Sequence, residues 1–258
     1  LFALLEEGIG CLLSSFDEKM ADSLFAGISG GSAADNKEKI YDFLLKIKAA
    51  KVFDNGSDAV NVISMGVEDD DGIALIAGTG SVAFAKKKNE IKRIGGWGYF
   101  FDGAGGGFDF GREALSAVYK YIDGTGEYTL LKELIENKLG EGADKALAKI
   151  YEGGKRYIAA FAPQVFEAYK QGDSVAERIV KRNTGHWINL IKTAEKWVQT
   201  EKVVFAGSIF KQEEILLPLI KDGLDKKINP VIPKIPPVYG AVREAMKLCG
   251  MSCTERIK

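Results

Sequence analysis

The 258-residue chain has few residues of the kinds that build disulfide or metal frameworks, with three cysteines and a single histidine. Cys11, Cys249 and Cys253 do not form the even, spaced set of a disulfide-rich secreted domain. Cys249 and Cys253 are four residues apart, and two thiols alone do not complete a zinc site. His186 lies in a predicted helix with no evident partner in the sequence, so we expect it to be structural.

Strong charge and long apolar runs are also missing. A net charge of −1 argues against an extended basic surface for nucleic acid or an anionic membrane. The basic run 86–88 lies at a predicted hairpin tip, where solvated lysines are usual. No apolar run reaches the roughly 20 residues of a membrane-spanning helix, and the first residues do not read as a signal peptide. We expect a cytoplasmic protein that binds neither nucleic acid nor a membrane.

The chain is instead rich in glycine, with 30 residues, many of them between positions 72 and 111. Residues 72–77 form a short apolar run typical of a buried strand. The run ends at Gly78, Thr79, Gly80 and Ser81, the first glycine loop. Glycine allows close approach of a ligand to the backbone, and the two hydroxyls add donors, so this loop is expected to bind an oxyanion.

A predicted β-hairpin follows, with strands at 82–85 and 91–94 and a polar turn between them. Glycines return at 95–98, the tryptophan loop, and at 102–107, the second glycine loop. A helix is expected at 112–121. Two glycine-rich segments flank one hairpin, and the second leads to a helix N-terminus, where phosphate groups bind readily.

Strand and helix patterns alternate along the rest of the chain, which indicates an α/β fold. The acidic run 66–71 is the expected boundary between two lobes. Residue 58 is expected at or near a helix N-cap. The expected helices are 1–13, 36–47, 58–65, 130–139, 143–151, 174–199, one near 212 and one from 237; the expected strands are 22–28, 51–53 and 202–206, with a turn at 54–57, apolar helical stripes at 156–170 and an extended segment at 229–237.

Three segments carry a specific resemblance: GIALIAGTGS at 72–81, GGWGYFF at 95–101 and GREAL at 111–115. They resemble the N-acetylglucosamine kinase and BadF/BadG/BcrA/BcrD ATPase family, within the sugar kinase–Hsp70–actin superfamily. The resemblance implies a two-lobed, ribonuclease H-like (actin-like ATPase) α/β fold with a cleft between the lobes. Residues 1–71 would be an incomplete N-terminal lobe, 72–238 the C-terminal lobe with helical insertions, and 239–258 a helix returning to the first lobe.

The resemblance also implies roles for individual residues. Asp58 would be the general base on the sugar hydroxyl. Asp54 is the alternative candidate for the base, and the structural alternative for Asp58 is that it only caps a helix. Trp97 would stack on a sugar or belong to the core. Asp102 stands one position earlier than the family's sugar-binding aspartate, which leaves sugar identity open. The expected ATP-binding residues are Gly78, Thr79, Gly80, Ser81, Gly207 and Ser208, and the expected substrate-binding residues are Gly96, Trp97 and Asp102.

The expected activity is ATP-dependent phosphorylation of an amino sugar, with ATP and Mg²⁺ as cofactors. A homodimer is left open. Two alternatives remain: a BadF/BcrA-type ATPase subunit serving an iron–sulfur protein, and an inactive sugar or nucleotide sensor. The family's opening hairpin, with its Asp-Gly-Gly-Gly-Thr-Lys sequence, has no counterpart here, and we expect a piece of a longer protein rather than a lost catalytic wall.

Overall fold

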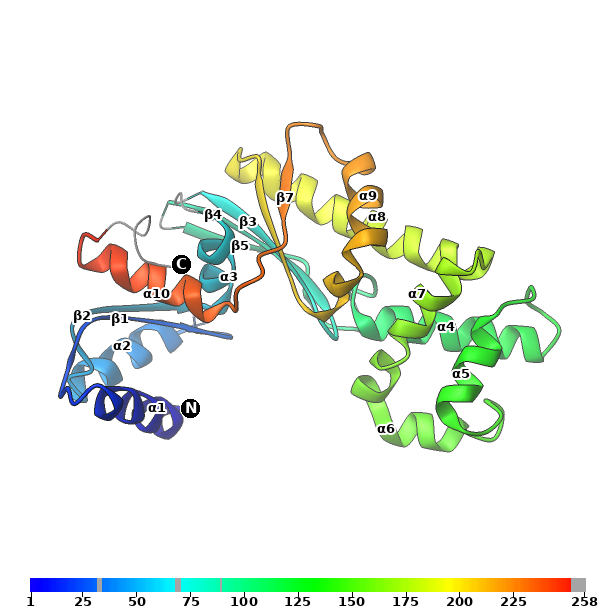
Figure 1. Cartoon of the computed structure of the whole chain (residues 1–258), viewed down its shortest axis with the longest axis horizontal. Helices are drawn as coiled ribbons and strands as arrows, with labels where there is room; N and C mark the ends of the chain where they lie inside the picture. The colour runs from blue at the N-terminus through cyan, green and yellow to red at the C-terminus, as the bar shows by residue number, and fades with distance from the viewer. Residues whose placement is uncertain (32–33, 68–70, 89, 252–258) are drawn as a thin grey trace. The chain divides into compact units, whose positions relative to one another are not determined.

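The computed structural model describes residues 1–31, 34–67, 71–88 and 90–251. The chain divides into two compact units, one made of residues 1–72 and 233–258 and the other of residues 73–232 (Figure 1). The three-part division expected from the sequence remains a proposal. No helix in the described ranges is long and apolar enough to cross a membrane.

The first unit is built on two parallel strands, β1 (Ala21–Ile28) and β2 (Ala50–Ser57). Alternate β1 residues around Ala26 pack with Ile40 and Leu44 of α2 (Asn36–Lys46) in a small core. Helices α3 (Asp58–Gly66) and α10 (Val238–Leu248) also pack on the strand pair. Helix α1 (Phe2–Ser15) contacts α2, since the ring of Phe2 lies 4.8 Å from that of Phe43. Figure 1 shows α1 and α2 together and α10 on the opposite side of the two strands.

A close helix crossing joins the chain's last described helix to this unit. Gly240 of α10 lies so near the backbone oxygen of Asn61 in α3 that a side chain at position 240 would overlap it. Asn61 also donates a 3.1 Å hydrogen bond to the carbonyl of Gly27 in β1. Strand β1, α3 and α10 therefore pack as one body.

The second unit contains a five-stranded sheet in the order β5-β4-β3-β6-β7. Strands β3, β6 and β7 pair in parallel, while β4 and β5 form the predicted antiparallel hairpin. Because β3 and β6 are parallel neighbours, the loops that follow them leave the same edge of the sheet. The strands are β3 (Gly72–Ala77), β4 (Ser81–Lys87), β5 (Glu90–Ile94), β6 (Lys202–Ala206) and β7 (Asn229–Val231).

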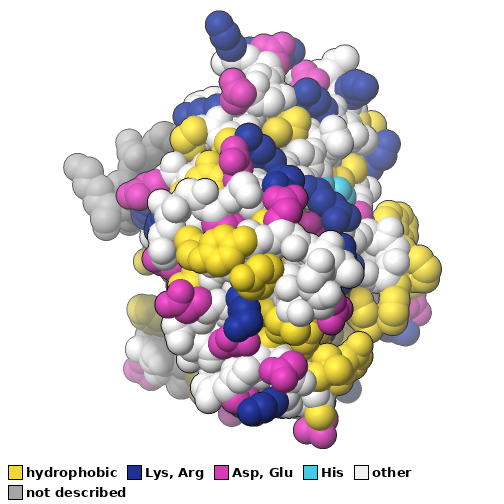
Figure 2. Space-filling model, turned by 90° about the vertical axis from the view of Figure 1, so that its right-hand side faces the viewer, with side chains coloured by type: hydrophobic (Ala, Val, Ile, Leu, Met, Phe, Trp, Pro, Cys, Tyr) yellow, Lys and Arg dark blue, Asp and Glu magenta, His cyan; other side chains and the backbone are white. Residues whose placement is uncertain are grey.

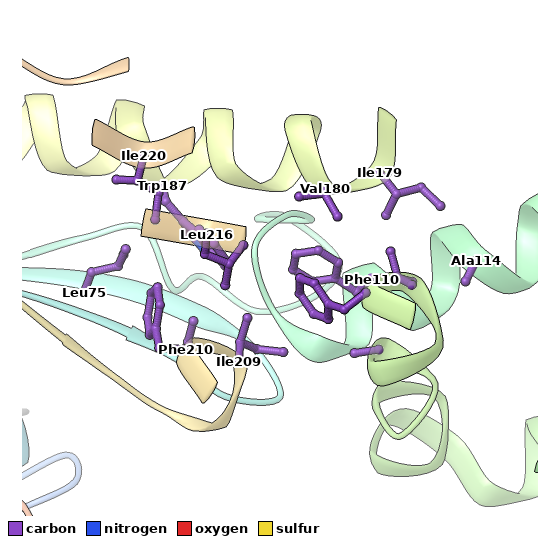
Figure 3. Packing of buried hydrophobic residues seen from close by; sticks show 14 of the residues in the cluster. Leu75, Phe110, Ala114, Ile179, Val180, Trp187, Ile209, Phe210, Leu216 and Ile220 are labelled. Carbon is purple, nitrogen blue, oxygen red and sulfur yellow. The ribbon is translucent and has the colours of Figure 1, made fainter. Parts of the chain in front are cut away.

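Helix α8 packs on strands β4 and β5 of this sheet and provides the largest fully buried side chain among the described residues. Trp187 of α8 is fully buried, and its ring centroid lies 5.9 Å from that of Phe110 and 5.2 Å from that of Phe210. Figure 3 shows Trp187 pointing from α8 toward this core. The helices are α4 (Gly107–Ile122), α5 (Leu131–Leu139), α6 (Leu147–Ala159), α7 (Ala162–Lys170), α8 (Ser174–Val198), the 3₁₀ helix Ser208–Gln212 and α9 (Glu213–Gly223).

Several sequence predictions of local structure were wrong. Residues 54–57 are not a turn, since they continue β2. Helix α4 begins at Gly107 rather than at residue 112. The hairpin strands run to Lys87 and start again at Glu90, which leaves Lys86 buried instead of solvated. The helix expected at 143–151 is displaced toward the C-terminus and runs from 147 to 159.

The surface carries both signs of charge. On the face shown in Figure 2, acidic and basic side chains lie intermixed among hydrophobic patches. An arrangement of this kind does not concentrate one sign of potential on that face.

Candidate functional site

The first glycine loop leaves the carboxyl end of β3, beside the carboxyl end of β6. Ile76 pairs with Ala206, so residues 78 and 207 emerge from adjacent strands. The N–H of Gly78 donates a 2.9 Å hydrogen bond to the carbonyl of Gly80, which closes a tight turn. In parallel sheets, ligands bind in the crevice outside the carboxyl ends of the strands.

Backbone hydrogen bonds join the first glycine loop to the start of α4. The N–H of Gly107 donates to the carbonyl of Gly78 at 2.8 Å, and that of Phe108 donates to the carbonyl of Thr79 at 3.0 Å. A Cβ on Gly106 would lie 2.5 Å from the carbonyl oxygen of Thr79. The two glycine-rich segments thus meet at backbone distance, and no side chain fits between them.

These contacts change which donors are free for a ligand. The amides of Gly107 and Phe108, at the N-terminus of α4, are already used by the first glycine loop. Thr79 and Gly80 are exposed, and no acceptor within the described part of the chain takes their N–H groups. The free backbone donors therefore belong to the turn rather than to the helix.

Two side chains of helix α8 hydrogen-bond to the second glycine loop. Asn183 Oδ1 accepts a 2.6 Å hydrogen bond from the N–H of Gly105, and Trp187 Nε1 donates to the carbonyl of Gly105 at 3.0 Å. Ser81 Oγ donates to the carbonyl of Ala104 at 2.8 Å. The hydroxyl proton of Ser81 is thus engaged inside the protein, where it fixes one glycine loop to the other.

A buried carboxylate caps α4 at the same junction. Asp109 Oδ2 accepts a 3.0 Å hydrogen bond from the N–H of Gly106, and Arg112 lies 3.5 Å from Oδ1. Burial raises the pKa of Asp109, while the Gly106 N–H and the Arg112 charge act in the opposite direction. The guanidinium also donates to the carbonyl of Gly103 at 3.2 Å, which adds a further tie to the second glycine loop.

A cavity of about 400 Å³ opens beside the first glycine loop, entirely within the second unit. Its size lies in the range of small-molecule sites. Its lining combines apolar side chains with hydroxyl, amide and ammonium groups. It is lined by Gly78, Thr79, Gly107, Ala159, Ala160, Ala162, Pro163, Phe166, Ser208, Ile209, Lys211 and Gln212.

Gly207 links β6 to this cavity. Its φ is +111°, and a side chain there would overlap the backbone of Ala77. Only glycine meets both demands without strain. The 3₁₀ helix that follows brings Ser208 into the same lining as Thr79. Of the predicted nucleotide residues, Gly78, Thr79 and Ser208 line this cavity, whereas Gly80, Ser81 and Gly207 are not part of its lining.

The tryptophan loop is shaped by Asp102. Asp102 Oδ2 accepts hydrogen bonds from the N–H groups of Gly96 and, at 3.3 Å, Trp97. His186 Nε2 lies 3.7 Å from Oδ1 of the same carboxyl group. Trp97 is 66% exposed, with the Arg93 guanidinium 4.1 Å from its ring centroid, so the alternative of a core tryptophan is wrong.

Asp58 lies in the other unit, in the first turn of α3. Ser57 is the N-cap, since its Oγ accepts a 3.2 Å hydrogen bond from the N–H of Ala59. The same hydroxyl donates to Asp58 Oδ1 at 3.1 Å. The cap role considered for Asp58 is therefore filled by its neighbour, and the Asp58 side chain is half-buried.

Sequence reasoning missed several residues of this region. Asn183 and Trp187 hold the second glycine loop from a helix about eighty positions away, and no local sequence pattern indicates this role. Lys211 and Gln212 line the cavity but read as ordinary surface residues. Lys155 lies beside the first glycine loop. Within the described residues, no group of three or more His, Cys, Asp or Glu side chains is placed to hold a metal ion.

Comparison with known proteins identifies the class. Residues 2–245 match the profile of the BadF/BadG/BcrA/BcrD ATPase family, and the chain belongs to this family. It is 28% identical over 257 residues to the N-acetylmuramic acid/N-acetylglucosamine kinase of Clostridium acetobutylicum, covering 95% of this chain and 83% of that protein. It is 24% identical to the N-acetyl-D-glucosamine kinase of Dictyostelium discoideum, covering 88% of this chain and 76% of that one.

Solved structures support the fold expected from the sequence. A protein of Porphyromonas gingivalis, provisionally assigned as an N-acetylglucosamine kinase, superposes with a TM-score of 0.64 at 15% identity, covering 90% of this chain and 78% of that one. The ROK hexokinase of Thermus thermophilus superposes with a TM-score of 0.57 at 14% identity, covering 96% of this chain and 85% of that one. The α/β, actin-like sugar kinase fold is thereby confirmed.

Proposed function

We propose that this protein transfers a phosphoryl group from ATP to a hydroxyl of an amino sugar of the N-acetylglucosamine type. The observation that carries the proposal is the junction of the first glycine loop with the start of α4, beside a cavity that Ser208 also lines. Amino-sugar kinases among the relatives support the choice of substrate class. The family itself is one of ATPases.

The cavity suits the nucleoside part of ATP. Apolar side chains such as Pro163 and Phe166 offer surface to a flat base, and Ser208 and Gln212 offer hydrogen bonds. The exposed N–H groups of Thr79 and Gly80 would then receive phosphate oxygens, because free backbone amides bind oxyanions well. Gly80 has no Cβ to interfere with that approach. Around the position that a Cβ would take there, only the end of Lys155 lies within 4 Å.

The tryptophan loop suits the sugar. An exposed indole provides an apolar face for a pyranose ring, and Asp102 holds the backbone of the loop in place through the amides of Gly96 and Trp97. We assign Asp58 as the base that takes the proton of the attacking hydroxyl, with Asp102 as a sugar-loop residue. Mg²⁺ is proposed as the counterion of the phosphates, since phosphoryl transfer depends on charge neutralisation.

The test is direct. The protein is incubated with ATP and Mg²⁺ and a panel of N-acetylglucosamine, N-acetylmuramic acid, glucosamine and glucose, and sugar phosphate is measured by mass spectrometry. We expect phosphate on at least one amino sugar and much less on glucose. ATP hydrolysis without sugar phosphate would favour the ATPase-subunit alternative, and ligand binding without turnover would favour a sensor.

Replacing Trp97 tests the sugar side separately. We expect Trp97→Ala to raise KM for the sugar about three- to tenfold with little change in KM for ATP, because stacking on an aromatic face contributes roughly 0.5–1.5 kcal/mol. Trp97→Tyr should recover part of the loss. The matched control is Tyr128→Ala, since Tyr128 is also 66% exposed but lies outside the glycine-rich region. If Trp97→Ala and Tyr128→Ala change KM for the sugar equally, Trp97 does not contact the sugar.

A further inference from the structure

An unassigned ammonium group lies beside the first glycine loop. Lys155 is on α6, directly after Gly154, whose non-helical φ and ψ of 60° and −156° break that helix. Its Nζ lies 3.9 Å from the position that a Cβ would take on Gly80. The group therefore lies against the backbone of the turn whose amides are free.

The ammonium of Lys155 lies close to two aromatic rings. Nζ lies 5.0 Å from the ring centroid of Tyr99 and 6.0 Å from that of Phe108. Within the described ranges, no carboxylate reaches ion-pair distance of Lys155; Asp109 acts on it only from further away and is paired with Arg112. A half-buried cation held over aromatic rings, with no carboxylate partner, favours an anion brought by a ligand.

The place of Lys155 along α6 indicates which part of a ligand it meets. Ala159, one helical turn further on, lines the cavity proposed for the nucleoside, whereas Lys155 lies outside that lining and next to Gly80. A nucleotide with its base in the cavity would run along Thr79 and Gly80, so its outer phosphates would approach Nζ.

We propose that Lys155 binds the phosphates of the nucleotide beyond the first, as a positioning residue for the group to be transferred; this rests on the function proposed above. Its charge neutralises phosphate oxygens that the uncharged amides of the first glycine loop contact, and the aromatic rings beneath keep the ammonium over the turn. Lys155 does not read as a site residue in the sequence, because the turn that it serves lies 75 positions away.

Isothermal titration calorimetry of the 258-residue protein with ATP, ADP and AMP tests the proposal. Lys155→Met keeps most of the side-chain volume and removes the charge. We expect it to weaken ATP binding about ten- to a hundredfold, the range for losing a charge-assisted hydrogen bond, and AMP binding less than about twofold. Lys155→Arg should recover most of the ATP affinity. Lys149→Met, which removes an exposed charge from the same helix, should leave both affinities unchanged.

Thermal melting of each variant separates binding from folding. Lys155→Met with wild-type ATP affinity overturns the proposal, and so does an equal loss for ATP and AMP, since that would indicate a structural effect on the whole cavity. The proposed function fails in a different way: a wild-type protein that binds ATP but yields no sugar phosphate loses its assignment as a kinase, while the selective loss in Lys155→Met would still place this lysine on the outer phosphates.

Discussion

Asp58→Asn is expected to reduce the rate of sugar phosphorylation by about 10²–10⁴-fold, the usual contribution of a general base. Asparagine keeps the size of the side chain and an oxygen that can accept from Ser57 Oγ, but it cannot take up the proton of a sugar hydroxyl. The capping bond from the N–H of Ala59 to Ser57 is not touched by the change. We therefore expect KM for ATP and for the sugar, and the melting temperature, to stay near their wild-type values.

The control for this variant is Asp54→Asn. Asp54 lies in β2, where its carboxylate accepts from the N–H of Asn55 at 2.8 Å and lies 3.8 Å from Lys37 Nζ. Asp54 was the alternative base on sequence grounds, so both variants are assayed side by side for sugar phosphate. A loss of turnover in Asp54→Asn, with normal turnover in Asp58→Asn, would transfer the role of base to Asp54.

Gly106→Ala is expected to give the largest effect on the nucleotide side. The new Cβ would lie 2.5 Å from the carbonyl oxygen of Thr79 and would also overlap Gly80, and both neighbours are backbone. The first glycine loop would have to move away from α4, which breaks the hydrogen bonds of Gly107 and Phe108. We expect the free energy of unfolding to fall by about 1–3 kcal/mol, as for other overpacked sites, and ATP affinity to fall by at least about tenfold.

Denaturant unfolding and calorimetry with ATP measure the two effects. Gly185→Ala is the matched control, because Gly185 lies inside α8 with open space around its Cβ position. There the same substitution should raise the free energy of unfolding by about 0.5–1 kcal/mol, since alanine is the better helix former. If Gly106→Ala binds ATP normally, the contact between the two loops has no role in nucleotide binding.

Local patterns in the sequence predicted most elements that carry the site. The apolar runs of β3 and β6 and their glycine endings were predicted correctly, since a buried strand that stops at glycine is a strong local signal. The long helix α8 was predicted as well; its N-cap is Asp173, whose Oδ1 accepts from the N–H of Ala176 at 2.8 Å. The resemblance in three short segments was confirmed by the family match.

Tertiary contacts explain what sequence patterns could not show. The segment 54–57 contains residues typical of turns, yet it pairs with 25–28 of β1, and that pairing overrides the local preference. The early start of α4 depends on acceptors at Gly78 and Thr79, which belong to a different loop. Lys155 reaches the turn from another helix. Site residues of these kinds become visible only once distant segments are placed in space.

The hydrogen bonds from Gly107 and Phe108 to the first glycine loop have a thermodynamic consequence. The loop acquires its shape during folding, in the absence of nucleotide, so little conformational entropy is left to be lost on association. Preorganisation of this kind means that evolution can tune nucleotide affinity from a distance, through α4 and α8, without altering an atom that the ligand touches.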